Sequence, residues 1–378
     1  MEEESLQRNA NFFLVVTIAL VAFGLIMIFS SSGIVTNSLE KKGMYYSLVR
    51  QSAWAILGFL SLFIILRKDL EWWNKYSFFI LLLFIVLLAS TIFFHTGRSA
   101  KRWVMGGQPS ELVRVFFLLY LSIFFSKRED SNEGFIKGVF PPCIILGIIL
   151  GILVAQPHYG MAVFFCLLTI FIFFVAGMRI RHIFVLFLVF FIIMSAAIGS
   201  RAYSRNRVKA FLSKYPITSN LPFVKGFVEN KDNDKKIDRW QVDQSIIALG
   251  SGGLFGVGLG KSKQKLSCVP LPYTDFIFSI IGEELGFILG SLLLFVLFAL
   301  FAYFGFSIAY HSQFPSGFFL AFSLTISIIL QAIINIAIVS DSIPTTGLPL
   351  PFISYGGSSL LSNLIAVGLI LNVARQKP

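Results

Sequence analysis

Charged residues are scarce in this sequence, and their scarcity excludes most classes of soluble protein. They make up 13% of the 378 residues, whereas hydrophobic residues make up 56% and the mean hydropathy is +0.81. Aromatic side chains that carry a polar group are also few, because 43 Phe stand beside 5 Trp and 11 Tyr. Phe surface suits hydrocarbon or a helix interface. The composition therefore predicts an integral membrane protein and excludes a water-soluble enzyme.

Cysteine is rare as well. Cys143 and Cys166 lie inside apolar runs, and Cys268 lies in a polar stretch. Neither their number nor their spacing fits a disulfide framework or a zinc site. We therefore predict no metal-ligand cluster, and as a cofactor the sequence leaves open only a divalent cation, Mg²⁺ or Mn²⁺.

Apolar runs dominate the rest of the chain. A spanning helix takes about 20 mainly apolar residues, or somewhat fewer where flanking side chains reach the interface. Ten segments qualify: Phe12 to Ser30, Gln51 to Leu66, Ser77 to Phe94, Glu111 to Phe125, Val139 to Ala155, Gly160 to Gly177, Ile183 to Gly199, Leu285 to Tyr310, Phe318 to Val339 and Tyr355 to Val373.

We expect an all-α integral membrane protein of about ten transmembrane helices that form a single polytopic domain over residues 1–378. Helices 1–7 fall within 12–199, a long extracytoplasmic loop occupies 200–274, and helices 8–10 fall within 276–373.

The placement of basic residues predicts the orientation. With a cytoplasmic N-terminus, the short inside segments hold eleven Lys and Arg, and the short outside loops hold six. The positive-inside rule then puts both termini in the cytoplasm and the long loop outside. The net charge of +12 would suggest nucleic acid in a soluble protein. Here anionic headgroups and phosphate-bearing lipids are the expected counter-charges, and no nucleic acid is expected.

The long loop is not uniformly polar. Its middle, Glu229 to Arg239, is typical of a solvated charged segment. Arg201 to Pro216 is basic and amphipathic, which suits the headgroup zone. Gln241 to Gly260 is rich in glycine and too apolar to float in water, so we expect both of these ends to lie in or on the membrane.

Five collinear segments resemble one family. Gln244 to Gly286 resembles the signature region of the SEDS proteins (shape, elongation, division and sporulation) of bacterial cell-wall synthesis. The other four begin at Gly97 (GRSAKRWVMGGQPSEL), Ala155 (AQPHYGMA), Ser204 (SRNRVKAF) and Gly347 (GLPLPFISYGGSSLLSNL). The run Lys261 to Lys265, the Arg50-Gln51 pair and SRNRVKAF are more similar to the division-type (FtsW) branch than to the elongation-type (RodA) branch.

The resemblance implies a glycosyltransferase that polymerises lipid II into glycan strands at the outer face of a bacterial inner membrane during division. It also implies a class B penicillin-binding protein and other divisome membrane proteins as partners, because the polymer made in this reaction needs crosslinking. Two other interpretations stay open from the residues. A lipid-linked sugar flippase also needs many helices and a cavity, and a non-catalytic scaffold would recruit a transpeptidase.

Asp275 is the residue best suited to act as a general base. It follows Pro270, Pro272 and Tyr273 and precedes the apolar run Phe276 to Ile281, so it lies at a membrane boundary. A carboxylate there is costly unless it has partners or a function. The alternative is a helix N-cap formed by Thr274 or Asp275. The resemblance favours catalysis, because this acid occupies the catalytic position of the family motif TDFIF.

Pyrophosphate must be held by cations, and the family motifs supply Arg102 beside Trp103, Arg207 and Lys265. Headgroup anchoring is the alternative for each of them. The stretch Gly250 to Gly260 could cradle a phosphate through its backbone amides, but it lacks the spacing and the ending of a P-loop.

Two pairs of charges fall near helix starts. Glu111 and Arg114 lie three residues apart and can form an ion pair inside the membrane or bind substrate. Glu283 and Glu284 are either partners of a helix dipole or site residues, and we favour the structural interpretation.

The remaining predicted substrate-binding residues belong to two irregular segments. Gln156 begins Gln-Pro-His where the family has Gln-Pro-Asp, a departure that puts the role of His158 in doubt. Leu271 and Tyr273 likewise replace a family Glu and His. Ser354 and Gly356 lie in Gly347 to Ser359, which is either a re-entrant wall of the substrate cavity or a simple break at an outside turn. The predicted substrate-binding set is thus Arg102, Trp103, Glu111, Arg114, Gln156, Arg207, Lys265, Ser354 and Gly356.

Overall fold

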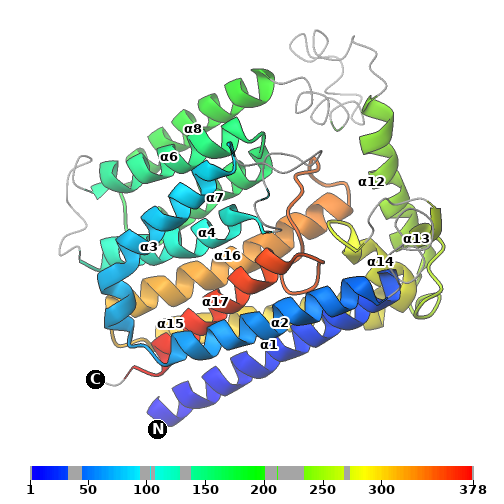
Figure 1. Cartoon of the computed structure of the whole chain (residues 1–378), viewed down its shortest axis with the longest axis horizontal. Helices are drawn as coiled ribbons and strands as arrows, with labels where there is room; N and C mark the ends of the chain where they lie inside the picture. The colour runs from blue at the N-terminus through cyan, green and yellow to red at the C-terminus, as the bar shows by residue number, and fades with distance from the viewer. Residues whose placement is uncertain are drawn as a thin grey trace.

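Long apolar helices run side by side in the computed structural model of the chain (Figure 1). The structure describes residues 2–32, 45–93, 103, 107–127, 138–200, 211, 234–267 and 273–376. Its elements are α1 (Glu2–Ser32), α2 (Tyr46–Leu66), α3 (Leu70–Ser90), α4 (Pro109–Ser126), α6 (Phe140–Ala155), α7 (Tyr159–Val175), α8 (Ile180–Ser200), α12 (Asp234–Ser251), α13 (Gln264–Ser267), α14 (Ile277–Gly286), the π-helix η2 (Phe287–Leu292), α15 (Leu293–Tyr310), α16 (Pro315–Val339) and α17 (Gly357–Ala374).

Each expected apolar segment coincides with a helix in the described part of the chain. Eight helices there are long and apolar enough to cross a membrane. The other two, α6 and α7, are apolar but have only 16 and 17 residues. The expected all-helical membrane fold is therefore confirmed, while the number of spans and the single-domain boundaries stay predictions.

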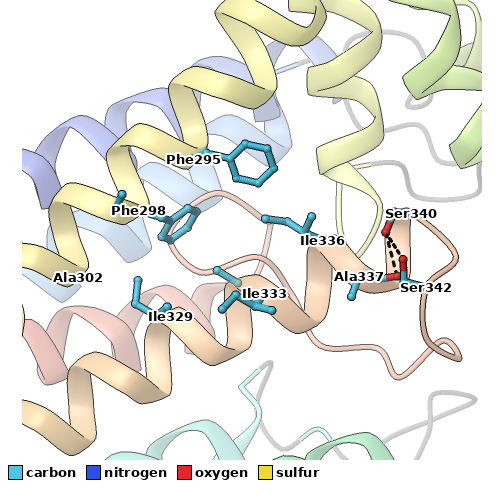
Figure 2. A pocket seen from close by; sticks show the side chains of 11 residues that line it. Phe295, Phe298, Ala302, Ile329, Ile333, Ile336, Ala337, Ser340 and Ser342 are labelled. Atoms are coloured by element: carbon cyan, nitrogen blue, oxygen red, sulfur yellow. Dashed lines mark hydrogen bonds between the residues drawn. The ribbon is translucent and has the colours of Figure 1, made fainter.

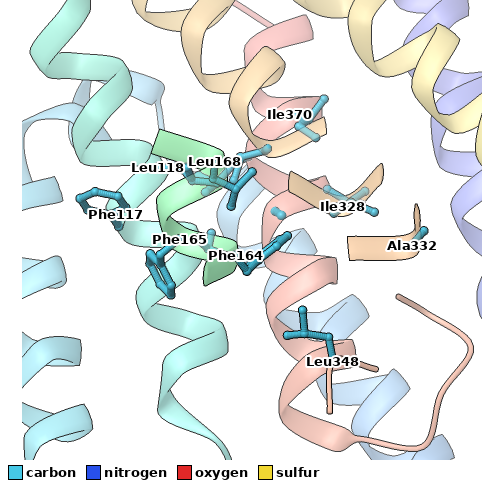
Figure 3. Close-up of a cluster of buried hydrophobic side chains, with 14 of the residues drawn as sticks. Phe117, Leu118, Phe164, Phe165, Leu168, Ile328, Ala332, Leu348 and Ile370 are labelled. Atoms are coloured by element: carbon cyan, nitrogen blue, oxygen red, sulfur yellow. The ribbon is translucent and has the colours of Figure 1, made fainter. Parts of the chain in front are cut away.

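The helices differ in how far they are covered by their neighbours. In α17, 83% of the apolar window is buried, and in α4 72%, whereas α3 and α8 each bury 17%. The core lies where α4, α7, α16 and α17 meet, and it includes Phe117, Phe164, Phe165, Ile328 and Ile370 (Figure 3). Packing of such side chains holds membrane helices together, because lipid gives little hydrophobic drive for association.

Both chain ends lie at the same end of the bundle, where α1 begins and α17 ends (Figure 1). The opposite end carries the last turn of α1, the short helix α14 and α12, which crosses this end beside α14. We call it the Asp275 end. The shared position of the termini agrees with an even number of spans.

The expected eighth helix, Leu285 to Tyr310, is formed largely by η2 and α15, and the separate short helix α14 precedes it. Gly286, where φ is 73° and ψ is −169°, separates α14 from η2. Gly has no Cβ and tolerates this conformation. The long loop also departs from expectation, because Asp234 to Arg239 begins the helix α12. Most of Arg201 to Pro216, predicted to lie at the membrane surface, falls outside the described residues.

Candidate active site

Asp275 lies in the turn just before α14, and the residue is half-buried. The N-cap of α14 is Phe276. Phe276 makes no side-chain cap hydrogen bond. The helix-cap and catalytic interpretations of Asp275 therefore both stay predictions, and the residue lies partly exposed beside the start of an apolar helix.

Main-chain hydrogen bonds fix the position of this turn. Ser354 Oγ donates to the carbonyl of Thr274 at 2.7 Å, and the Tyr355 amide donates to the carbonyl of Tyr273 at 2.9 Å. Asn335 Nδ2 donates to the carbonyl of Asp275, also at 2.9 Å. Three consecutive carbonyls are thus held by donors from the C-terminal part of the chain, which leaves the orientation of the turn tightly constrained.

The segment that supplies two of these donors folds into the protein without helical structure. Leu348, Leu350, Phe352 and Ile353 are all buried, and no helix is assigned between α16 and Gly357. Non-helical backbone at membrane depth is tolerated only when it is enclosed by protein or lines a cavity. Of the two interpretations of Gly347 to Ser359, the geometry favours a re-entrant segment over an outside turn.

Ser354 and Gly356 shape this re-entrant segment. The Ser354 hydroxyl accepts from the Leu350 amide at 2.8 Å while donating to Thr274. The Gly356 amide donates to Gln51 Oε1 at 3.2 Å. Both residues bond to other parts of the protein, so they position the wall beside Asp275, and their predicted contact with substrate stays a prediction.

Glu111 and Arg114 form the expected ion pair on α4. Arg114 Nη2 lies 3.4 Å from Glu111 Oε2, and the two side chains are 1% and 2% exposed. Arg114 also donates to Gln331 Oε1 and, at 2.6 Å, to Asn363 Oδ1. Burial this complete favours the structural interpretation of the pair over direct substrate binding.

A chain of amides connects this ion pair to the Asp275 turn. Gln331 Nε2 donates to the carbonyl of Pro349 at 2.9 Å, and Asn335 Nδ2 bridges the carbonyls of Leu348 and Asp275. The three amide side chains Gln331, Asn335 and Asn363 were not among the predicted site residues. The spacing of Gln331 and Asn335, one helical turn apart inside an apolar run, was the available signal.

Lys265 is paired inside the protein. Its ammonium group is 2.7 Å from Glu284 Oε1 and donates to the carbonyl of Ser30 at 3.0 Å, and the residue is 2% exposed. This buried ion pair gives Lys265 a structural role, and its predicted contact with pyrophosphate stays a prediction. Of the lysines in this run, Lys261 and Lys263 are exposed.

The structural interpretation of Glu283 and Glu284 agrees with the structure. The Glu283 carboxylate accepts from Ser262 Oγ and from the Lys263 amide, the latter at 2.8 Å. Glu284 receives Lys265 and Ser30 Oγ. The two acids therefore tie the loop before α13 to α14 and α1.

Gln156 is likewise engaged inside the protein. Its amide nitrogen donates to the carbonyl of Leu88 at 2.9 Å and to Thr91 Oγ1, and the side chain is 1% exposed. His158 lies 3.3 Å from the amide nitrogen of Gln108 and is also buried. Gln156 thus joins the end of α6 to the end of α3.

Three predicted residues remain to be placed. Trp103 is 39% exposed, as suits an interfacial position. Arg102 and Arg207 lie outside the described residues. Across the part of the chain that the structure describes, no group of three or more His, Cys, Asp or Glu side chains could hold a metal ion.

Taken together, the apolar helices, the buried amide network and the acidic turn define a multi-pass membrane protein with a structured polar site at one end of its bundle. The family model described as "Cell cycle protein", which covers the FtsW, RodA and SpoVE proteins, matches residues 10–378. The chain therefore belongs to the FtsW/RodA/SpoVE family, as the sequence motifs indicated.

Curated relatives match nearly the whole chain. The probable peptidoglycan glycosyltransferase FtsW of Geobacter sp. (strain M18) is 34% identical over 373 residues, which cover 96% of this chain and 95% of the relative. Stage V sporulation protein E of Bacillus subtilis (strain 168) is 33% identical over 368 residues, with coverage of 96% and 95%.

Solved structures share the fold. The rod shape determining protein RodA of Thermus thermophilus is 23% identical, with a TM-score of 0.66 and coverage of 96% of this chain and 95% of that chain. A chain from a peptidoglycan synthase complex that coordinates polymerization and crosslinking is 24% identical, with a TM-score of 0.73 and coverage of 96% of both chains. These likenesses show that the chain shares its fold with both structures.

Proposed function

We propose that this protein is a peptidoglycan glycosyltransferase that polymerises lipid II into glycan strands for septal cell-wall synthesis. Relatives with that printed activity are 34% identical over nearly the entire chain. The observation that carries the proposal is the Asp275 turn, in which three consecutive carbonyls are held while the carboxylate stays partly exposed.

In this reaction Asp275 is the general base. Its carboxylate takes the proton from the acceptor sugar hydroxyl, whose oxygen attacks the anomeric carbon of the donor. The bond from that carbon to the lipid pyrophosphate breaks, and the pyrophosphate leaves with the electron pair. A positioned base of this kind typically accelerates a reaction by about 10² to 10⁴. Arg102 and Arg207 are proposed to hold the departing pyrophosphate, and a requirement for Mg²⁺ or Mn²⁺ stays a proposal to be tested by metal removal.

Gly347 brings the re-entrant segment next to the carboxylate. A Cβ at this position would lie 3.6 Å from Asp275 Oδ2, which is an ordinary contact distance, and the residue has φ 76°. Glycine is favoured here because of this positive φ.

The test is a polymerisation assay on purified protein in liposomes supplied with labelled lipid II. Glycan chains would support the proposal. Transbilayer movement of lipid II without polymer would instead establish a flippase, and neither product would favour a scaffold.

The partner is proposed to be a class B penicillin-binding protein, whose transmembrane helix lies in a groove between α15 and α16. The groove has a volume of about 450 Å³ and is lined by apolar residues that include Phe295, Phe298, Ala302, Ile329 and Ile333 (Figure 2). Small residues such as Ala302 let helix backbones approach closely in lipid. A crosslinking partner suits the function, because polymerised strands must be joined to the wall.

The location is proposed to be the bacterial inner membrane, with both termini in the cytoplasm and the Asp275 end outside. This orientation rests on the excess of basic residues in the short segments at the other end. It also gives the site access to lipid II on the face where the wall is built.

A further inference from the structure

A small apolar surface at the Asp275 end has no role in the proposed reaction. Residues 252–260, which we call the glycine-rich finger, connect α12 to the segment before α13. Leu254, Phe255, Val257 and Leu259 are 59%, 73%, 38% and 54% exposed. Exposing four large apolar side chains within six residues is costly in water, so a nonaqueous contact is expected for them.

The finger is fixed to the protein through its backbone. The Gly253 and Leu254 carbonyls accept from the amides of Phe287 and Ile288 at 2.9 and 3.1 Å. In the other direction, the amides of Val257 and Gly258 each donate at 2.9 Å to the carbonyls of Glu283 and Glu284.

These four bonds satisfy the backbone groups exposed by the helix break at Gly286, which is how broken helices persist at membrane depth. They also occupy amides that a phosphate cradle would need. The finger is therefore a rigid part of the fold whose side chains, and not its backbone, are available to the surroundings.

The position of the finger points to lipid. Its attachment residues, Phe287 and Ile288, begin the exposed apolar side of η2, which continues with Leu289 at 56% exposure. The Gly260 amide donates to Ser30 Oγ at 3.0 Å, so the base of the finger lies at the last turn of α1. The apolar finger surface therefore continues the exposed apolar side of η2 and lies beside the last turn of α1.

Charge favours lipid over a protein partner. Lys261 and Lys263 follow the finger and are exposed. Lysine is depleted in protein interfaces, whereas apolar side chains beside exposed lysines are typical of segments that enter the boundary between headgroups and acyl chains.

We propose that the glycine-rich finger inserts its apolar side chains into the membrane leaflet at the Asp275 end, with Lys261 and Lys263 at the headgroup phosphates. The finger would then fix the height of α14, and hence of Asp275, relative to the lipid headgroups. The insertion itself does not depend on the proposed glycosyltransferase activity.

Spin labels measure this insertion directly. In protein whose three cysteines are replaced by serine, a nitroxide is attached to Cys introduced by Phe255→Cys, and the protein is reconstituted in nanodiscs with an anionic lipid. Leu289→Cys is the lipid-facing control and Lys261→Cys the headgroup control. The accessibility of each label is measured to oxygen, which concentrates in hydrocarbon, and to a water-soluble nickel chelate.

We expect the ratio of oxygen to nickel accessibility at position 255 to be several-fold higher than at 261 and close to that at 289. A ratio at 255 equal to or below that at 261 overturns the proposal. Protection of position 255 from both reagents also overturns it, because the finger would then be covered by protein. Unchanged melting of the labelled variants shows that the fold is intact, and Leu254→Cys provides a second position with the same expectation.

Discussion

At the scale of single residues, the hydrogen bonds that hold the Asp275 turn use its backbone, whereas the proposed chemistry uses the Asp275 side chain. Asn335, Ser354 and Tyr355 each donate a hydrogen bond to a main-chain carbonyl of the turn. The identity of the side chain at position 275 is therefore not needed for these contacts. This separation makes chemistry and folding independently testable.

Asp275→Asn should abolish polymerisation without disturbing the fold. The amide keeps the shape of the carboxylate but cannot accept the proton, so we expect turnover of labelled lipid II to fall by about 10² to 10⁴. Melting in detergent should match the wild-type protein. Asp341→Asn, which changes an acid just beyond the C-cap of α16, is the control and should keep its activity. Polymer formation by Asp275→Asn within a few-fold of wild type would show that another group is the base.

Arg114→Met should be among the most destabilising single substitutions in the chain. It leaves the buried Glu111 carboxylate without its cationic partner. It also removes the guanidinium group that donates hydrogen bonds to Gln331 and Asn363. Breaking one partner of a buried ion pair costs about 3 to 5 kcal/mol.

The double variant Glu111→Leu with Arg114→Met should recover part of this loss, because no charge is stranded. Recovery should be incomplete, since the two amides still lack their donor. The melting of both single variants and the double variant in detergent measures this coupling. Strictly additive losses would mean that the two charges do not interact.

At the scale of elements, the break between α14 and α15 depends on a glycine that no other residue replaces easily. A Cβ at Gly286 would lie 2.3 Å from the Gly256 backbone nitrogen, and its φ of 73° is unfavourable for other residues. Both effects act on the same backbone contact, the one that joins the glycine-rich finger to the membrane helices.

Gly286→Ala should therefore lower the free energy of unfolding by at least about 1 to 3 kcal/mol, the usual cost of a strained backbone residue. Gly250→Ala is the matched control. A Cβ there meets nothing within 4 Å, and the position is helical, so it should be neutral or slightly stabilising. Equal melting temperatures for the two variants would contradict the proposed role of the break.

The groove between α15 and α16 is the second element that can be tested. Ala302→Trp should fill it and reduce co-purification with the proposed class B penicillin-binding protein, while the protein itself stays folded. Ala53→Trp on the exposed side of α2 is the control for added bulk in lipid. If both variants retain the partner equally, the partner helix binds elsewhere.

At the scale of the whole molecule, apolar run length was sufficient to predict where the helices lie. All ten expected segments overlap helices. A bilayer can be crossed only by long apolar helices, so long apolar runs in the sequence show where they lie. The break at Gly286 was missed, since an isolated glycine in an apolar run has no periodic signature.

The candidate site was predictable only in part, for a physical reason. The TDFIF motif identified Asp275 as a candidate. The ion pair of Lys265 could not be predicted, because only the folded backbone brings its partner Glu284 within 2.7 Å. The amide network was missed because Gln331, Asn335 and Asn363 meet groups that lie far away in the sequence. Burial and pairing across such separations cannot be deduced from residue type alone.

The order of synthesis affects the hydrogen bonds that hold the Asp275 turn. The donors Asn335 and Ser354 come 60 and 80 residues after the carbonyls that they hold. A nascent chain that has already exposed the acid must still insert α15, α16 and the re-entrant segment before the turn acquires its geometry. Every truncated translation product that stops short of these residues is thus an unassembled site. The Asp275 turn gains its final geometry only when α16 and the re-entrant segment are in place.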